Sequence, residues 1–496
     1  MRNAQWLIAM ASTIVMFYLV FGCCHQRHFT AVICCIGLTI SYLMRFSLAI
    51  AMTEMAEPPM AKEDPNACPM PPYKETKSRN RTLFPWTEMQ QGIILSSFFW
   101  GYVLTPIAGG LMSEAYGAKP VLSVGVACTS LATFLTPLFV HVWDWVGLIA
   151  MRVIIGLSQG VVYAALHTIV AHWIPSQERG TWGTVVFTGA QFGNTLCTLC
   201  TSQLLDAFAG WEIVFYLYGS LGLVWTIVFC MTTFSTPVDH PLLINSEKEV
   251  LCIYMARVRK RKLNRGTPWR KIISSRPVIV MVIAMIGHDW GMFALVNDIP
   301  KYLKSVLHFN VKQNGFYMAL GYLLICIVGI ASGVLTDAIE RRQWISSTRN
   351  RKIMATLASI GPSFGLIGVS YSGCSTARAV TCLVVGMAFM GFYYPSLKVN
   401  PIDLAPNFAG TVAAVTHSIG GISGIVVPYV IGVLTPNCFM MEWRLVFWIT
   451  FFVILSTNFV YIFYGSAVLQ PWNDETEEEP LLREAACESI VSFNSQ

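Results

Sequence analysis

The sequence contains little charge. Asp, Glu, Lys and Arg make up 12% of its 496 residues, whereas soluble domains carry about 25%. Hydrophobic residues make up 54%, and the mean hydropathy is +0.56. Because one membrane-spanning helix needs about 20 apolar residues, half of this chain can supply roughly a dozen spans. This composition excludes a soluble enzyme, a secreted disulfide scaffold and a nucleic-acid-binding protein.

The sequence also lacks the local patterns of common catalytic and cofactor sites. It shows no phosphate-cradling glycine loop, metal-ligand cluster or nucleophile triad, so we expect neither catalysis nor a resident cofactor. Most of the 15 cysteines are expected to be small buried apolar residues. Cys68, Cys374 and Cys438 fall in loops expected outside, where one bridge among them could form.

Apolar segments predict an all-α integral membrane protein with twelve transmembrane helices in two six-helix bundles. The predicted parts are an apolar extension (1–28), a first bundle (29–234), a basic linker (235–277), a second bundle (278–465) and an acidic tail (466–496). The predicted spans cover 29–53, 91–113, 121–142, 146–170, 183–205, 212–234, 278–299, 314–337, 353–371, 379–399, 410–434 and 443–465.

The charges of the loops predict the orientation. The 235–277 linker and the 338–352 loop are rich in Lys and Arg, and such loops face the cytoplasm. Both ends of the twelve-helix core are then cytoplasmic, and the 54–90 loop is outside. That loop contains Asn80-Arg81-Thr82, so we expect Asn80 to be glycosylated. Residues 3–24 are uncharged and apolar; a signal, an extra span or an interfacial segment would fit, and we favour an uncleaved or partly embedded extension.

The two halves repeat the same loop motifs. Each repeat has a glycine, an acid four residues later and a following basic residue, and the matched turns after the fourth and tenth spans agree in position. We expect the glycine to permit close helix approach and the acid to accept hydrogen bonds from a neighbouring helix N-terminus. Such a duplication predicts two bundles facing a central cavity. The candidate gating and coupling residues in these loops are Glu114, Lys119, Glu178, Arg179, Asp337, Arg341 and Asp403.

Four longer strings carry a family resemblance. They are SYLMRFSLAI (41–50), GIILSSFFWGY (92–102), RVIIGLSQG (152–160) and NPIDLAP (400–406). With the repeated loops, they resemble the major facilitator superfamily and, within it, solute carrier family 17. That branch includes sodium–phosphate cotransporters, sialin and vesicular glutamate and nucleotide transporters. The resemblance covers about residues 29–472 and implies anion transport by alternating access.

Two arginines, Arg45 and Arg152, lie inside predicted apolar spans. Placing an arginine at mid-bilayer costs roughly 2.5–3.5 kcal/mol on insertion scales. An anionic substrate would offset this cost, because guanidinium donates two parallel hydrogen bonds to a carboxylate or phosphate. The alternative is an arginine that snorkels or pairs within the protein. The resemblance implies that both arginines contact the substrate.

Other polar residues bear on coupling and on the cavity lining. Gln159 lies two helical turns after Arg152, where the proton-coupled relatives that resemble this segment have Glu. Since an amide cannot titrate, we predict drive by sodium or voltage, with proton coupling as the alternative. His288 and Asp289 interrupt the seventh span; His288 could bind an anion when protonated, or be a neutral structural histidine. We expect Tyr42 and Tyr163 to line the cavity.

We therefore predict a secondary active transporter of small anions, and phosphate, urate, sialic acid, glutamate and nucleotides all fit an arginine pair. The alternatives are a proton-coupled vesicular or lysosomal organic-anion transporter, and a receptor or scaffold that has lost transport. The predicted partners are the small anion, membrane lipid and a coupling ion, either sodium or a proton. We expect no nucleic-acid partner and a functional monomer.

The acidic tail carries a candidate sorting signal. Glu477 precedes Leu481-Leu482 by four residues, which resembles the acidic dileucine signal read by clathrin adaptors. We expect the polar tail from Trp472 onward to be disordered, which would leave this signal accessible. The signal predicts an endosomal, lysosomal or vesicular membrane. The alternative is the plasma membrane, with Leu481-Leu482 an ordinary pair.

Overall fold

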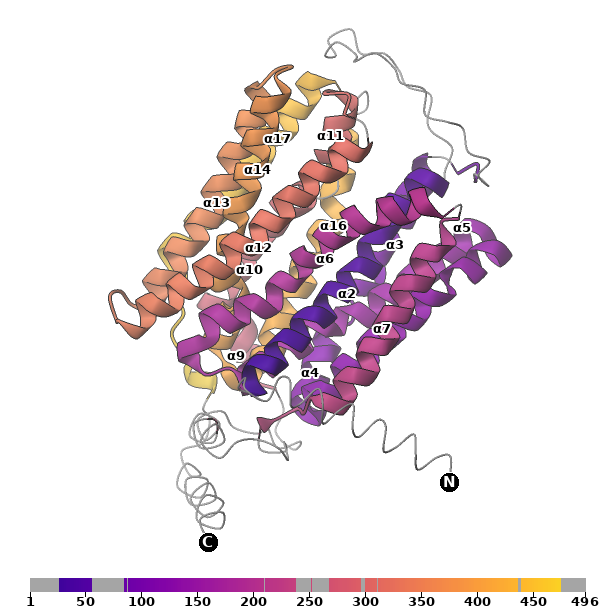
Figure 1. The fold of residues 1–496 in the computed structure, drawn as a ribbon. Helices are drawn as coiled ribbons and strands as arrows, with labels where there is room; N and C mark the ends of the chain where they lie inside the picture. The colour runs from indigo at the N-terminus through magenta and orange to yellow at the C-terminus, as the bar shows by residue number, and fades with distance from the viewer. Residues whose placement is uncertain are drawn as a thin grey trace, which may run out of the picture.

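The computed structural model describes residues 26–55, 84–86, 88–208, 210–237, 251, 267–295, 299–309, 311–435 and 439–473. Its helices form two bundles, one from each half of the chain, which lie side by side (Figure 1). The first comprises α2 (Gln26–Met55), α3 (Glu88–Tyr102), α4 (Pro106–Tyr116), α5 (Ala118–Trp173), α6 (Arg179–Ala207) and α7 (Glu212–Thr232). The second comprises α10 (Arg276–Phe293), α12 (Val311–Arg341), α13 (Ser347–Tyr371), α14 (Thr376–Phe389), α16 (Ala409–Leu434) and α17 (Met440–Tyr464), with short helices α9 (Trp269–Ser274), α11 (Ile299–Ser305) and α15 (Asn400–Leu404).

The helix lengths are consistent with twelve membrane crossings. In the described ranges, ten helical segments are long and apolar enough to span a membrane. One of them, α5, has 56 residues and would be roughly 84 Å long if straight, far more than one bilayer. It is broken at Trp143 and Asp144, whose backbone angles are not helical, and so supplies the predicted third and fourth spans. The 29-residue helix α6 is long enough for a further crossing.

Three predicted spans are less regular than expected. The second is divided at residues 103–105, because Pro106 can begin a helix but cannot continue one. The seventh ends at Phe293 rather than at 299. In the tenth, α14 ends at Phe389 and is followed by a 3-10 turn, η4 (Met390–Tyr393), and a π-helical turn, η5 (Tyr394–Lys398). Irregular backbone at membrane depth is tolerated where protein surrounds it, and most residues of η4 and η5 are buried.

Both ends of the helical core lie at the same end of the molecule. We call this end the linker face and define it by the turns at 174–179, 341–347 and 404–409. At the start of α2, Arg27 donates to Glu178 at 3.1 Å, and after α17 the Asn473 side chain accepts from the Asn407 N–H at 3.0 Å. An even number of crossings requires this arrangement.

The beginning of the C-terminal tail packs on the linker face. Trp472 is 7% exposed and its ring lies 6.2 Å from that of Phe408, while the Gln470 N–H donates to the Leu404 carbonyl. The expectation of disorder is therefore wrong for Trp472 and Asn473, because apolar and hydrogen-bonding partners from distant turns are available to them. Glu477, Leu481, Leu482, Asn80 and residues 3–24 lie outside the described residues.

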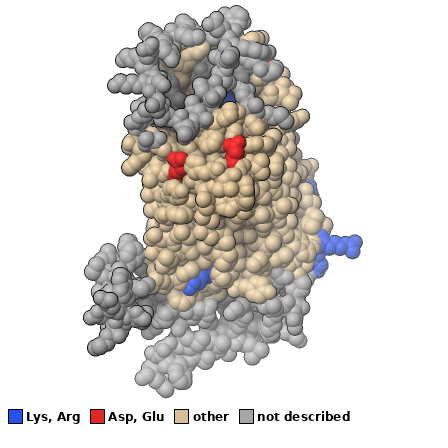
Figure 2. All heavy atoms as spheres, turned by 90° about the vertical axis from the view of Figure 1, so that its right-hand side faces the viewer, with Lys and Arg blue, Asp and Glu red and all other residues tan. Residues whose placement is uncertain are grey.

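The surface between the two ends is apolar. Figure 2 shows one side on which Lys, Arg, Asp and Glu are absent from the middle of the visible described surface. Large apolar side chains are strongly exposed on the described helices; Leu104, Val224 and Tyr429, for example, are 60–74% exposed. Extensive exposed apolar surface marks contact with other apolar matter, which for these helices is lipid.

Cys374 lies in the turn between α13 and α14, at the opposite end of α13 from the linker face. It is disulfide-bonded, and all other described cysteines are free. Its partner is therefore outside the described residues. Of the three cysteines predicted to form a bridge, at least Cys374 does so.

Candidate functional site

The two bundles meet at the linker face through two pairs of glycines. A Cβ atom on Gly110 of α4 would lie 2.7 Å from the carbonyl oxygen of Gly410 in α16. In the same way, a Cβ on Gly333 of α12 would lie 2.6 Å from the carbonyl oxygen of Gly180 in α6. Only glycine permits this spacing. The two contacts repeat each other across the bundle interface, as the duplicated motif predicts.

The acid of each motif caps a helix of the other bundle. The Glu114 carboxylate accepts from the backbone N–H and the hydroxyl of Thr411, at 2.6 and 2.8 Å. The Asp337 carboxylate accepts from the backbone N–H groups of Gly180 and Thr181, at 2.8 and 2.7 Å. A carboxylate at a helix N-terminus meets free N–H groups and the positive end of the helix dipole. The predicted capping role is confirmed for both acids.

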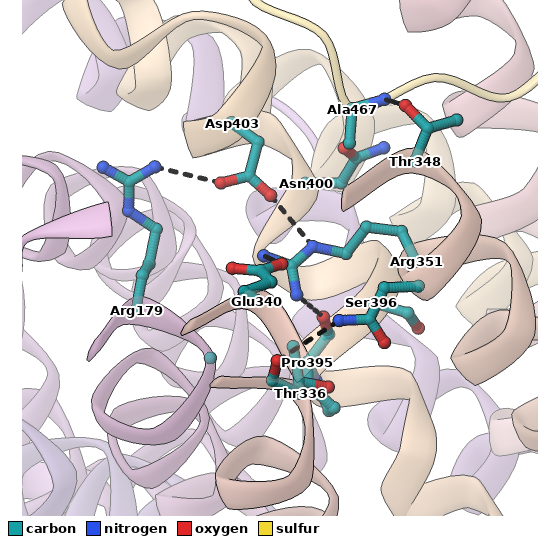
Figure 3. Close-up of polar contacts among 12 residues, drawn as sticks. Arg179, Thr336, Glu340, Thr348, Arg351, Pro395, Ser396, Asn400, Asp403 and Ala467 are labelled. Carbon is teal, nitrogen blue, oxygen red and sulfur yellow. Dashed lines mark hydrogen bonds and ion pairs between the residues drawn. The ribbon is translucent and has the colours of Figure 1, made fainter. Parts of the chain in front are cut away.

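A network of ion pairs adds a third connection between the bundles (Figure 3). Asp403 accepts from Arg179 of the first bundle and from Arg351 of the second, both at 2.9 Å. Arg351 also pairs with Glu340 at 3.3 Å and donates to the Pro395 carbonyl at 2.7 Å. The arginine side chains are at most 4% exposed. Sequence analysis missed Arg351 and Glu340 as site residues. In the sequence they stand in or beside a basic turn, where charged residues are expected and give no sign of a buried ion pair.

The remaining candidate gating residues behave differently. Arg341 of α12 reaches the first bundle, where its Nε donates to the Gln177 carbonyl at 3.5 Å. The side chains of Lys119 and Glu178 make contacts within the first bundle: Lys119 Nζ lies 4.7 Å from the ring centre of Phe234, and Glu178 pairs with Arg27 and His28 of α2. These two residues hold turns of their own bundle, so their expected place in the gate between the bundles is not supported.

Above the linker face, a small cavity lies within the first bundle at its boundary with the second. Its central charge is Arg45, which is 5% exposed. Five aromatic rings surround the guanidinium, with ring centres 4.3–5.5 Å from Cζ. These rings belong to Tyr42, Phe46, Phe98, Phe99 and Tyr102. The cavity is lined by Leu38, Ser41, Tyr42, Arg45, Tyr102, Gln159, Val162 and Tyr163.

Arg152 lies directly behind Arg45. It is 5% exposed, and its Nη1 donates to the backbone carbonyl of Arg45 at 3.0 Å, while its buried Nε has no hydrogen-bond partner. In the part of the chain that the structure describes, no carboxylate oxygen lies within 4.0 Å of either arginine. Neither arginine therefore forms an ion pair at contact distance within the described chain, although Arg45 interacts electrostatically with Asp289 of the second bundle. Burial in the bundle argues against snorkelling.

Polar groups of α2 and α5 close the cavity beside Arg45. The Gln159 amide donates to the Ser41 carbonyl at 2.8 Å, and the Tyr42 and Tyr163 hydroxyls are 2.8 Å apart. The structure thus brings together Arg45, Gln159, Tyr42 and Tyr163. It places Arg152 one layer behind them.

The second bundle contributes a facing group of polar residues. The His288 ring stacks on that of Tyr393, with ring centres 3.6 Å apart. Asp289 interacts electrostatically with both Arg45 and Lys398, so it faces cations of both bundles. His167 of the first bundle contacts the carbonyls of Tyr163 and Lys398 at 2.7 and 3.0 Å.

Sequence analysis missed Lys398 and His417, which the structure brings to the same place. Lys398 Nζ lies 3.1 Å from His417 Nε2 and 3.7 Å from the ring centre of Tyr163. A lysine inside the predicted 379–399 span is the same signal that drew attention to Arg45. Lys398 could have been found by examining every predicted span for charged residues.

Comparisons with known proteins agree with this architecture. The sequence model of the Major Facilitator Superfamily matches residues 34–428. A "Putative inorganic phosphate cotransporter" of Drosophila ananassae is 32% identical, over 92% of this chain and 96% of its own length. Human sialin is 30% identical over 91% of each chain, and human vesicular glutamate transporter 2 is 30% identical over 92% of this chain and 77% of its own length.

Solved structures show the same fold at low sequence identity. The proton:xylose symporter XylE is 12% identical and aligns with a TM-score of 0.66, covering 89% of this chain and 95% of its own. The transporter FucP in an outward conformation is 14% identical and aligns with a TM-score of 0.59, covering 88% of this chain and 98% of its own.

Proposed function

Since this chain belongs to the major facilitator superfamily and, within it, to the anion transporters of solute carrier family 17, we propose that it carries a small oxyanion past Arg45 and Arg152 by alternating access. One observation carries the proposal: Arg45 lines a cavity, Arg152 is buried directly behind it, and no carboxylate of the described chain lies within 4.0 Å of either guanidinium group. A bound anion supplies negative charge beside Arg45, whose guanidinium can donate hydrogen bonds to it, while the charge of Arg152 adds to the attraction from behind.

The contacts at the linker face supply the gate. Glu114, Asp337 and Asp403 each connect one bundle to the other, and all three contacts must break for the cavity to open toward that face. Because each carboxylate binds N–H groups or a guanidinium, the closed state is specific in its geometry. Once all three contacts have broken, the two bundles are free to rock about the bound substrate.

The proposed substrate is inorganic phosphate or a small carboxylate. The relatives named above include a protein named for inorganic phosphate cotransport and one named for glutamate transport. Phosphate is the preferred candidate, since a small cavity lined by Arg45 and by the rings of Tyr42, Tyr102 and Tyr163 suits a compact anion.

We propose that the linker face is cytoplasmic. Arg341 and Arg342 lie in its 341–347 turn and Arg349 in the first turn of α13, and basic loops face the cytoplasm. The disulfide at Cys374 supports this orientation, because it lies at the opposite end of α13 and disulfides persist in oxidising compartments outside the cytosol.

Transport is expected not to require a proton gradient. Gln159 is an amide that donates to the Ser41 carbonyl and cannot titrate. Purified protein in liposomes should therefore accumulate labelled phosphate or glutamate under an imposed sodium gradient or voltage. It should accumulate little under a pH gradient alone, with voltage clamped and sodium absent.

Strong accumulation under the pH gradient alone would show that another group carries a proton, and His288 would be the first to test. Uptake under none of the three gradients would favour a receptor or scaffold on the same fold. Empty liposomes and liposomes with heat-inactivated protein are the controls.

The tail is expected to direct the protein to endosomal, lysosomal or vesicular membranes. Replacing Leu481 and Leu482 by alanine should move a tagged protein toward the cell surface, since adaptors bind the leucine pair. Surface biotinylation measures the shift, and Ala485→Gly and Ala486→Gly together serve as the control in the same tail. Identical surface fractions for parent and dileucine variant would make the plasma membrane the better assignment.

A further inference from the structure

Lys398 is a buried cation of the second bundle that the arginine site does not use. It is 5% exposed and ends the π-helical turn η5. π-Helical turns occur often at functional sites, and irregular backbone within a membrane protein is found where it is buried or lines a cavity. Among the described residues, no carboxylate lies within 4.0 Å of its ammonium group.

Groups of both bundles surround Lys398. The aromatic rings of Tyr163 and Phe187 lie 3.7 and 5.7 Å from Nζ, and His167 contacts the Lys398 carbonyl at 3.0 Å. From its own bundle, His417 Nε2 lies 3.1 Å from Nζ. An ammonium group can only donate, so His417 Nε2 accepts and the proton of the neutral ring is on Nδ1.

Alternating access must remove the first-bundle partners. When the linker face opens, Tyr163, Phe187 and His167 move away with the first bundle, while His417 stays with Lys398. The Tyr393 ring, 5.9 Å from Nζ, also stays with Lys398, but the two nearer rings are lost. A buried ammonium group that loses its nearest cation–π partners is costly unless another charge or water replaces them. Tyr163 connects the two sites, because its hydroxyl contacts that of Tyr42, it lines the arginine cavity and its ring lies 3.7 Å from Lys398 Nζ.

We propose that Lys398 and His417 form a second anion-contacting site on the second bundle, which receives the oxyanion as the linker face opens. This inference rests on the proposed transport of anions. It also bears on the class of substrate. In the described interior above the linker face the buried cations are Arg45, Arg152 and Lys398, and the one acid, Asp289, interacts electrostatically with Arg45 and Lys398, so positive charge exceeds negative charge by two. This balance suits a doubly charged oxyanion, such as hydrogen phosphate.

Two measurements on the full-length protein test the site. The first is the initial rate of labelled phosphate uptake into liposomes, and the second is the rise in melting temperature that phosphate produces in detergent. Lys398→Gln should lower uptake at least tenfold and remove the phosphate-dependent rise. Lys398→Arg should retain at least half of the wild-type uptake rate and at least half of the phosphate-dependent rise. Lys352→Gln, which changes a partly exposed lysine of α13, should match the wild type in both measurements.

The outcomes separate this site from the transport function. A Lys398→Gln protein with uptake within twofold of wild type and an unchanged phosphate effect would overturn the site and leave transport intact. A wild-type protein that takes up no phosphate but shows a Lys398-dependent rise would support the site and overturn phosphate transport. A wild-type protein without any phosphate-dependent rise would overturn the site. If Lys398→Gln does not fold, His417→Ala should reduce the rise at least threefold, and an unchanged rise would overturn the site.

Discussion

Replacing Arg152 by alanine is expected to abolish anion transport while leaving the protein as abundant in the membrane as the wild type. Removing one partner of a buried charged contact costs about 2–5 kcal/mol, and each 1.4 kcal/mol is tenfold in affinity. Uptake at low anion concentration should thus fall at least about thirtyfold. Folding should be spared, because Arg152 has no carboxylate partner in the described chain and its removal leaves no buried acid uncompensated.

Two further variants separate charge from geometry. Arg152→Lys should also be impaired, because a lysine is a point charge without the planar fork of guanidinium. Arg276→Ala, an exposed arginine that stacks on Tyr464 with Cζ 4.3 Å from the ring centre, should transport normally. Near-normal uptake by Arg152→Ala in liposomes, at matched protein density, would show that Arg152 has only a structural role.

Replacing Asp403 by alanine is expected to have the largest effect on stability. The substitution leaves Arg179 without its partner across the bundle interface and removes one of two carboxylates from Arg351, whose side chain is 2% exposed. Breaking a buried ion pair by removing one partner costs about 3–5 kcal/mol. The melting temperature of the purified protein should fall clearly, and reagents applied from the linker face should reach the cavity more easily.

The matched control is Glu212→Ala, since Glu212 pairs with His141, which is 56% exposed. A pair at that exposure contributes about 0–1 kcal/mol, so this variant should melt close to the wild type. Equal melting temperatures for the Asp403 and Glu212 variants would mean that the Arg179–Asp403–Arg351 network does not hold the bundles together.

Local sequence patterns were enough to predict the architecture. Apolar length predicts the helices, because a span must be long enough to cross the bilayer and must satisfy its own backbone hydrogen bonds. The duplicated glycine–acid motif predicts close approach at Gly110 and Gly333 and the capping by Glu114 and Asp337, since these roles depend on the motif itself. Charge in an apolar segment singles out Arg45 and Arg152 in the same way.

What tertiary structure decided is which distant residues meet. Asp403 lies 224 positions from Arg179, and His167 lies 231 positions from Lys398, so no local pattern pairs them. Lys119 carries the same motif as the gating residues, yet its Nζ lies over Phe234 in its own bundle. Trp472 is ordered only because the 404–409 turn lies beside it. The sequence by itself therefore determines the membrane class, the repeat and the buried arginines, whereas the gate exists only where the two bundles come into contact, and the Lys398–His417 pair only where η5 and α16 meet within the second bundle.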